Sequence, residues 1–165
     1  MILIALGANL PSLAGQPADT LKRALGELER QGVEIRQVSA FYETPAWPDP
    51  ADPAFVNAVA AVKTSLQPVE LLVLLHGVET DFGRLRSASN APRTLDLDLL
   101  DYDGRVMTEP QLTLPHSRMA TRSFVLVPLS DIAPAWRHPV SGRNVAELLA
   151  SLPEGERSLP RLPKR

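Results

Sequence analysis

The chain has 165 residues, a length typical of a single domain that buries about 68–70% of its unfolded surface. Hydrophobic residues make up 44% of it and charged residues 22%, as in soluble globular proteins. The formal net charge of −2 argues against nonspecific binding to nucleic acid or anionic membranes, and the lack of cysteine excludes disulfides, thiolate chemistry and cysteine-based zinc sites. No basic segment precedes the first apolar run, and no apolar run could span a bilayer, so we expect a cytoplasmic protein without a signal peptide.

Up to residue 100, six segments have the apolar pattern of a strand or a helix. They are a strand over 2–6, a helix over 17–31, a strand over 33–42, a strand over 55–64, a helix over 68–82 and a strand over 91–100. The order β-α-β-β-α-β is that of the ferredoxin-like fold. We therefore expect an α+β sandwich in which two helices cover an antiparallel sheet.

A C-terminal extension of shorter elements is expected after this unit. It contains short strands over 105–107 and 111–114, a buried apolar segment over 124–129 and a helix over 144–151. The last residues, 153–165, combine Pro, Arg and Leu without periodicity, which predicts a loose tail. We place a single domain over residues 1–152.

The strand over 91–100 is the most informative stretch, because it alternates leucine with aspartate. Asp96 and Asp98 share one face, roughly 6.5–7 Å apart along the strand, and the leucines share the other face. Two carboxylates at this spacing suit a hard cation such as Mg²⁺, although they also suit the wet face of a half-covered sheet. Asp101 and Asp103 follow, so we expect a positive group to compensate this cluster.

The segment Pro92-Arg93-Thr94-Leu95-Asp96-Leu97-Asp98 resembles the signature of the 6-hydroxymethyl-7,8-dihydropterin pyrophosphokinase family. The resemblance extends to about Pro134 through short matches at 7–9, 41–45, 55–58, 79, 83–86, 115–116 and 122–124. It implies the ferredoxin-like fold and a reaction of the folate pathway. In that reaction the hydroxymethyl oxygen of the pterin attacks the β-phosphorus of ATP, pyrophosphate is transferred and AMP is released.

The resemblance also implies the site residues and a monomeric enzyme. Two Mg²⁺ ions would be held between the triphosphate and Asp96 and Asp98, with Arg84 and Arg93 completing the catalytic group. The implied ATP-binding residues are His76, Glu79, Arg84, Arg86, Arg93, Leu99, Thr113, His116 and Arg122. The implied pterin-binding residues are Thr44, Pro45, Ala46, Phe55, Asn57, Asp96 and Phe124. Without the resemblance, Phe55 and Phe124 would be interpreted as core residues of strands.

Two features depart from the family pattern. The segment 87–92 is shorter and less cationic than in many members, and His76 stands where glutamine is frequent. We hypothesise that Trp47, in the proline-rich loop over 43–54, covers the closed site instead. Alternatives are an inactive relative or a noncatalytic binding module, since the same element order serves RNA-recognition domains. RNA recognition would need aromatic residues and a basic sheet, which the strands over 2–6 and 91–100 lack.

Overall fold

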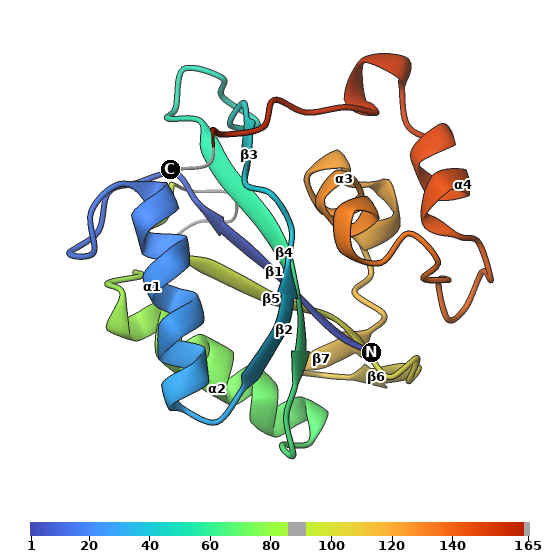
Figure 1. Ribbon diagram of the computed structural model, residues 1–165, viewed down its shortest axis with the longest axis horizontal. Helices are drawn as coiled ribbons and strands as arrows, with labels where there is room; N and C mark the ends of the chain where they lie inside the picture. The colour runs from blue at the N-terminus through green and yellow to red at the C-terminus, as the bar shows by residue number, and fades with distance from the viewer. Residues whose placement is uncertain (86–91, 164–165) are drawn as a thin grey trace.

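A five-stranded antiparallel sheet forms the centre of the computed structural model, which describes residues 1–85 and 92–163. Its strands are β1 (Ile2–Ala8), β2 (Glu34–Val38), β3 (Tyr42–Thr44), β4 (Phe55–Lys63) and β5 (Asp96–Tyr102). The order across the sheet is β2-β4-β1-β5, and the short β3 also pairs with β4 (Figure 1). This order confirms the predicted ferredoxin-like fold.

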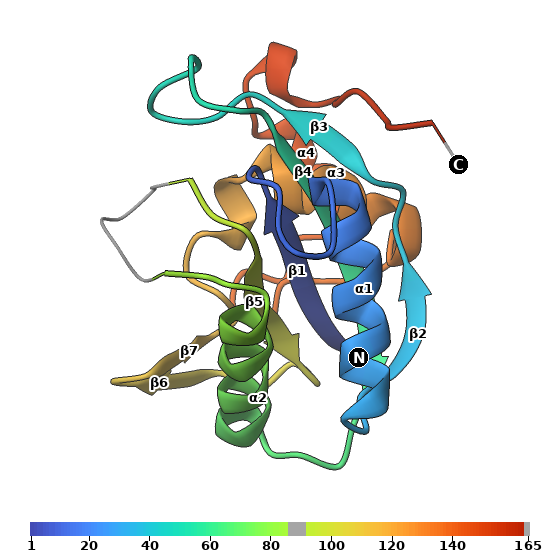
Figure 2. The same cartoon turned by 90° about the vertical axis from the view of Figure 1, so that its left-hand side faces the viewer.

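Helices cover both faces of the sheet. The long helices α1 (Pro17–Arg30) and α2 (Pro68–Asp81) lie on one face, and α3 (Ser123–Ile132) and α4 (Val145–Ala150) lie on the other (Figures 1 and 2). Each long helix begins with the predicted proline, whose missing N–H costs nothing in the first turn. Each is followed by a glycine with positive φ, Gly32 at 88° and Gly83 at 82°, as the sequence predicts.

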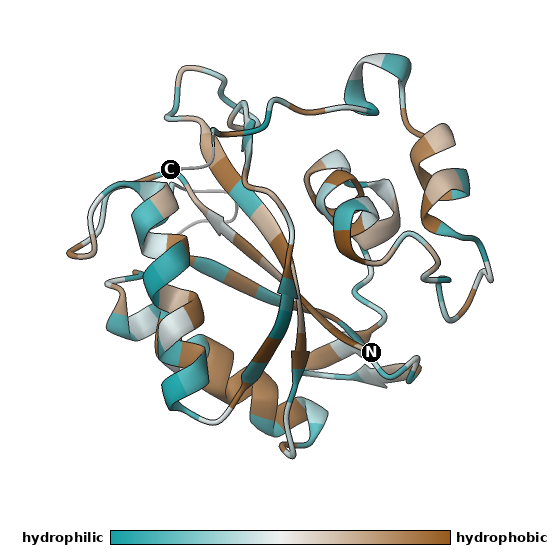
Figure 3. Ribbon diagram, in the orientation of Figure 1, coloured by the Kyte–Doolittle hydropathy of each residue, from teal (hydrophilic) through white to brown (hydrophobic). Residues whose placement is uncertain are grey.

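Two hydrophobic clusters stabilise this arrangement. The larger one packs β1, β4 and β5 against α1 and α2, and the smaller one packs the opposite face against α3. Figure 3 shows apolar residues along the central strands and α2, and polar residues on the outer surface of α1. The predicted alternation is confirmed, because Leu95, Leu97 and Leu99 are at most 2% exposed and belong to the larger cluster.

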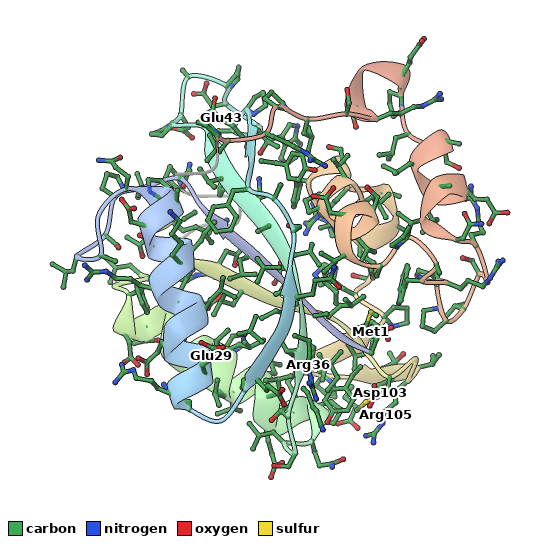
Figure 4. The ribbon with its side chains drawn as sticks, viewed as in Figure 1. Met1, Glu29, Arg36, Glu43, Asp103 and Arg105 are labelled. Carbon is green, nitrogen blue, oxygen red and sulfur yellow. The ribbon has the colours of Figure 1, made fainter. Side chains whose placement is uncertain are left out.

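Strand β5 differs from the prediction at both ends. It begins at Asp96 rather than near residue 91, and it continues to Tyr102. Leu100 shares the face of Asp96 and Asp98 and packs in the smaller cluster. A register shift against β1 then places Asp101 opposite Leu3 of that cluster, where the buried Asp101 carboxylate accepts a hydrogen bond from Trp136 Nε1 at 2.8 Å. Asp103 pairs with the amino group of Met1 at 2.8 Å, and Figure 4 shows these two residues beside each other.

The C-terminal part contains the hairpin of β6 (Met107–Glu109) and β7 (Leu112–Leu114), a 3₁₀ turn over Met119–Thr121, the helices α3 and α4, and a 3₁₀ turn over Glu154–Glu156. The buried segment over 124–129 is confirmed, and it is helical. Phe124 therefore lies in the first turn of α3 and not on a strand. The difference arises because a short apolar run fits either a buried strand or a buried helix.

The tail has specific partners where the sequence predicts a loose segment. Leu162 N donates to Phe41 O at 2.8 Å, and Glu43 N donates to Pro160 O at 2.9 Å, so residues 160–162 lie along β3. In the described part of the chain, none of the helices has both the length and the apolar character needed to cross a membrane. The monomeric state, the cytoplasmic location and the domain boundary at residue 152 stay predictions.

Candidate active site

A cavity of about 350 Å³ opens at one end of the sheet. It lies where β1, β4 and β5 meet the loop after β3 and the turn before α3. Many of the predicted site residues line this cavity: Thr44, Pro45, Phe55, Asn57, Arg93, Asp96, Asp98, Arg122 and Phe124. The fold therefore brings predicted pterin-binding, phosphate-binding and metal-binding residues together.

Asp96 and Asp98 enter the cavity from the same face of β5, opposite Gly7 and Ala5 of β1. Arg93 Nη1 lies 3.0 Å from Asp96 Oδ2, and Arg84 Nη1 bonds to Asp96 Oδ1. Both arginines are mostly buried, so these ion pairs are shielded from solvent. For Asp96, this confirms the predicted positive compensation.

Among the described residues, no basic side chain forms an ion pair with Asp98. Its burial and the neighbouring negative charge of Asp96 raise its pKa to about 6, against the opposing effect of Arg122, Arg84 and Arg93. A cation between the two carboxylates would relieve this repulsion. The described residues contain no group of three or more His, Cys, Asp or Glu side chains that could hold a metal ion. Two carboxylates alone fit Mg²⁺, which usually takes its remaining ligands from water and substrate phosphates.

Glu79 and Arg84 hold the Asp96 side chain in place from outside the cavity lining. Glu79, only 2% exposed on α2, accepts a hydrogen bond from Leu97 N at 2.8 Å and one from Arg84 Nη1 at 2.6 Å. Burial lowers the pKa of Arg84, but Asp96 and Glu79 outweigh it and raise that pKa overall. Neither Glu79 nor Arg84 lines the cavity. Their contacts therefore hold Asp96 and β5 in place. The nucleotide contacts that the sequence predicts for both stay predictions.

The opposite part of the cavity carries an amide and two aromatic rings. Asn57 Nδ2 donates to Thr44 Oγ1 at 2.7 Å, and both residues are buried on the paired strands β4 and β3. Phe55 begins β4 and Phe124 begins α3, and both are half-buried at the cavity. An amide edge beside aromatic faces suits a flat heteroaromatic ring with donors and acceptors on its rim.

Comparison with known proteins agrees with this geometry. The model of the 7,8-dihydro-6-hydroxymethylpterin-pyrophosphokinase (HPPK) family matches residues 3–134. The chain belongs to this family. It is 40% identical over 148 residues to the 2-amino-4-hydroxy-6-hydroxymethyldihydropteridine pyrophosphokinase of Synechocystis, covering 89% of this chain and 73% of the relative. It is also 40% identical over 161 residues to the enzyme of that name from Pseudomonas aeruginosa, covering 96% of each chain.

A solved structure supports the fold of this HPPK family member. The crystal structure of wild-type Plasmodium falciparum HPPK-DHPS superposes with a TM-score of 0.69 at 16% identity. The match covers 89% of this chain and 40% of that longer one. Family membership establishes the activity: the chain is a pyrophosphokinase of folate biosynthesis, a transferase that moves pyrophosphate to hydroxymethyldihydropterin.

The other predicted residues that the structure describes are absent from the cavity lining. Leu99 and Ala46 are buried, Thr113 is exposed on β7, and His76 is half-buried on α2. His116 N donates to Leu100 O at 2.8 Å beside β5, and burial together with Arg122 and Arg118 lowers the pKa of its imidazole. Arg86 and residues 87–91 lie outside the described part of the chain. The pterin contact of Ala46 and the nucleotide contacts of the other residues stay predictions.

The structure adds cavity residues that the sequence reasoning did not select. Arg118 and Thr121 line the cavity from the turn before α3, and Gly7 lines it from β1. Both residues lie between two segments that resemble the family, 115–116 and 122–124. Their position between these segments is the feature of the sequence that could have indicated them. Trp47 lies at the cavity with 68% of its surface exposed. This position is compatible with the hypothesis that Trp47 covers a bound substrate.

Proposed function

We propose that ATP is the pyrophosphate donor and that Mg²⁺ is held at Asp96 and Asp98. The pterin hydroxymethyl oxygen forms a bond to the β-phosphorus, the bond from that phosphorus to the oxygen shared with the α-phosphate breaks, and AMP leaves. The hydroxyl proton is released. The observation that carries the proposal is the presence of both carboxylates in the same cavity as the amide and aromatic rings.

The residues of the chain supply mainly positioning and charge. Phe55 and Phe124 would stack on the pterin, and Asn57 would bind its polar edge. Arg93 and Arg122 would neutralise phosphate oxygens, as phosphoryl-type transfer requires. Mg²⁺, when bound, neutralises negative charge on the phosphates and helps to align the attacking and leaving oxygens.

Asp96 lines the same cavity as Phe55, Asn57 and Phe124, so we assign it a secondary role in orienting the pterin hydroxyl. Arg84 acts through Asp96, because its guanidinium bonds to this carboxylate and to Glu79. A fixed carboxylate presents its second oxygen in a constant direction. This pre-organisation lowers the cost of assembling the reactive complex.

The nucleotide product tests the proposal directly. The folded protein is mixed with Mg²⁺, ATP and 6-hydroxymethyl-7,8-dihydropterin, and the products are separated. We expect AMP in equal amount to pterin pyrophosphate, and no turnover with excess EDTA. Formation of ADP, or full activity without a divalent cation, would overturn the proposal.

Variants of the carboxylates give a matched comparison. Asp96→Ala and Asp98→Ala are each expected to lower kcat by about 10²–10³-fold, the scale of losing one electrostatic contact to a transition state. Asp103→Ala is the control, because Asp103 lies beyond the end of β5 and pairs with Met1. Activity of both cavity variants within a few-fold of the wild type would contradict the metal assignment.

A further inference from the structure

The turn between β7 and α3 presents Arg118 to the active-site cavity. Arg118 N donates to His116 Nδ1 at 3.2 Å, and Thr121 Oγ1 donates to Arg118 O at 3.2 Å, so the backbone of the turn is braced at both ends. The side chain is exposed and lines the cavity together with Arg122. A braced backbone with an exposed guanidinium is suited to binding a ligand from solvent.

The charges around the cavity are unevenly balanced. Arg93 and Arg84 bond to Asp96, and Arg84 is shared with Glu79. By contrast, no carboxylate of the described residues forms an ion pair with Arg118 or Arg122. The side chain of Arg122 lies instead over the ring of Phe124, 5.3 Å from its centroid.

Arg118 and Arg122 line the same cavity and repel each other electrostatically. Burial lowers the pKa of Arg122, and Arg118 is the next largest cause of the lowering, against the opposing effect of Asp98 and Asp96. The same pair of arginines lowers the pKa of His116, after the effect of its burial. The repulsion between these positive charges costs free energy, and a bound polyanion would remove that cost by neutralising them.

We propose that Arg118 is a further substrate-binding residue that, beside Arg122, binds the polyphosphate chain of the nucleotide donor. The proposal rests on the proposed function, because it takes a nucleoside triphosphate as the donor. A guanidinium presents several N–H donors in a planar fork, which matches adjacent phosphate oxygens. Arg118 thereby supplies a phosphate contact that Arg84, engaged by Glu79 and Asp96, is poorly placed to make.

Inorganic tripolyphosphate is the probe, because it carries the charge of the donor without its base or sugar. Binding to the full-length protein is measured by titration calorimetry, with Arg118→Ala, Arg118→Lys and the control Arg105→Ala. Arg105 is an exposed arginine in the turn after β5, beside Met1 and Asp103 in Figure 4 and absent from the cavity. We expect Kd to rise about 5–10-fold for Arg118→Ala, less for Arg118→Lys, and not at all for Arg105→Ala.

Kinetics provide a second readout. Arg118→Ala is expected to raise KM for ATP by a similar factor, to leave KM for the pterin unchanged, and to weaken the salt dependence of tripolyphosphate binding. Unchanged tripolyphosphate binding in Arg118→Ala, or no binding by the wild type, would overturn the role of Arg118. The proposed function fails separately, if the wild type forms no AMP. Thermal melting of each variant shows whether it is folded. If Arg118→Ala does not fold, Arg118→Lys still tests the proposal.

Discussion

Gly7 of β1 lies so close to Asn57 of β4 that the sheet has no room for a side chain between them. A Cβ on Gly7 would stand 2.9 Å from Asn57 Oδ1, closer than real Cβ atoms come. Gly7 pairs with Asn57 on one side and with Asp96 on the other. The missing side chain therefore gives the amide its position in the cavity, where Asn57 bonds to Thr44.

Gly7→Ala is expected to impair pterin binding selectively. The added methyl group would displace the Asn57 amide and weaken its bond to Thr44, and losing one well-placed hydrogen bond corresponds to about a tenfold rise in KM for the pterin. KM for ATP should stay near the wild-type value. The control is Gly77→Ala on α2, where a Cβ meets nothing within 4 Å and should stabilise the helix. An unchanged KM for the pterin in Gly7→Ala would contradict this account.

Asp98 should make the metal-free protein less stable as the pH rises. Its folded-state pKa is about 6 against an ordinary value of 3.8, so the folded state binds the proton more tightly than the unfolded state does. Stability contributed by this proton is complete below pH 3.8 and is lost as the pH rises to about 6. Asp98→Asn removes this loss, because an amide does not ionise.

We therefore expect Asp98→Asn to be more stable than the wild type at pH 7 by roughly 1–3 kcal/mol, and to have lost activity with its carboxylate. The advantage should disappear near pH 3.5, where both side chains are neutral. Urea unfolding in EDTA at the two pH values measures the difference. Equal stability at pH 7 would show that Asp98 is not strained by burial and by Asp96.

Glu79 is expected to act as a positioning residue rather than as a nucleotide ligand. Glu79→Gln keeps the size of the side chain but weakens its bonds to Arg84 and Leu97 N, so unfolding should become easier by about 1–3 kcal/mol. Because Arg84 is then held less firmly against Asp96, kcat should fall while KM for ATP is retained. A raised KM for ATP with unchanged stability would instead support the nucleotide contact that the resemblance implies.

Much of the fold follows from local patterns that the sequence displays. Proline at the first turn and glycine after the last turn bound α1 and α2, and the Asp-Leu alternation fixes which face of β5 is buried. The cavity residues on β4 and β5 could be selected because short motifs carry them. Their convergence then follows from antiparallel pairing of both strands with β1.

The features that escaped prediction depend on contacts between distant segments. The burial of Asp101 needs the register shift against β1 and a donor from Trp136. The pairing of Arg84 with Glu79 and Asp96 brings together residues of α2, of the segment after it and of β5. The contacts of the tail with β3 could not be predicted, because the sequence of residues 153–165 has no periodicity. None of these contacts has a local signature, so only the folded arrangement reveals them.

The last prediction concerns the contact between the tail and β3. Arg161 Nε donates to the Tyr42 hydroxyl at 2.9 Å, the hydroxyl donates to Asp131 Oδ2 at 2.8 Å, and Arg161 Nη2 lies 2.5 Å from Asp131 Oδ1. Tyr42 belongs to β3, which ends at the cavity residue Thr44, so this cluster of three side chains fixes the strand that supports the pterin side.

A double-mutant cycle tests whether these side chains act together. Asp131→Ala should lower the stability by about 1–3 kcal/mol, because it removes an acceptor of Tyr42, Arg161 and Ala40 N. Arg161→Ala should lower the melting temperature in the wild-type background and have less effect once Asp131 is gone. Arg161→Ala should also raise KM for the pterin a few-fold without changing KM for ATP, since only the pterin side depends on β3. Additive effects on stability, together with unchanged kinetics, would mean that the tail rests on β3 without positioning it.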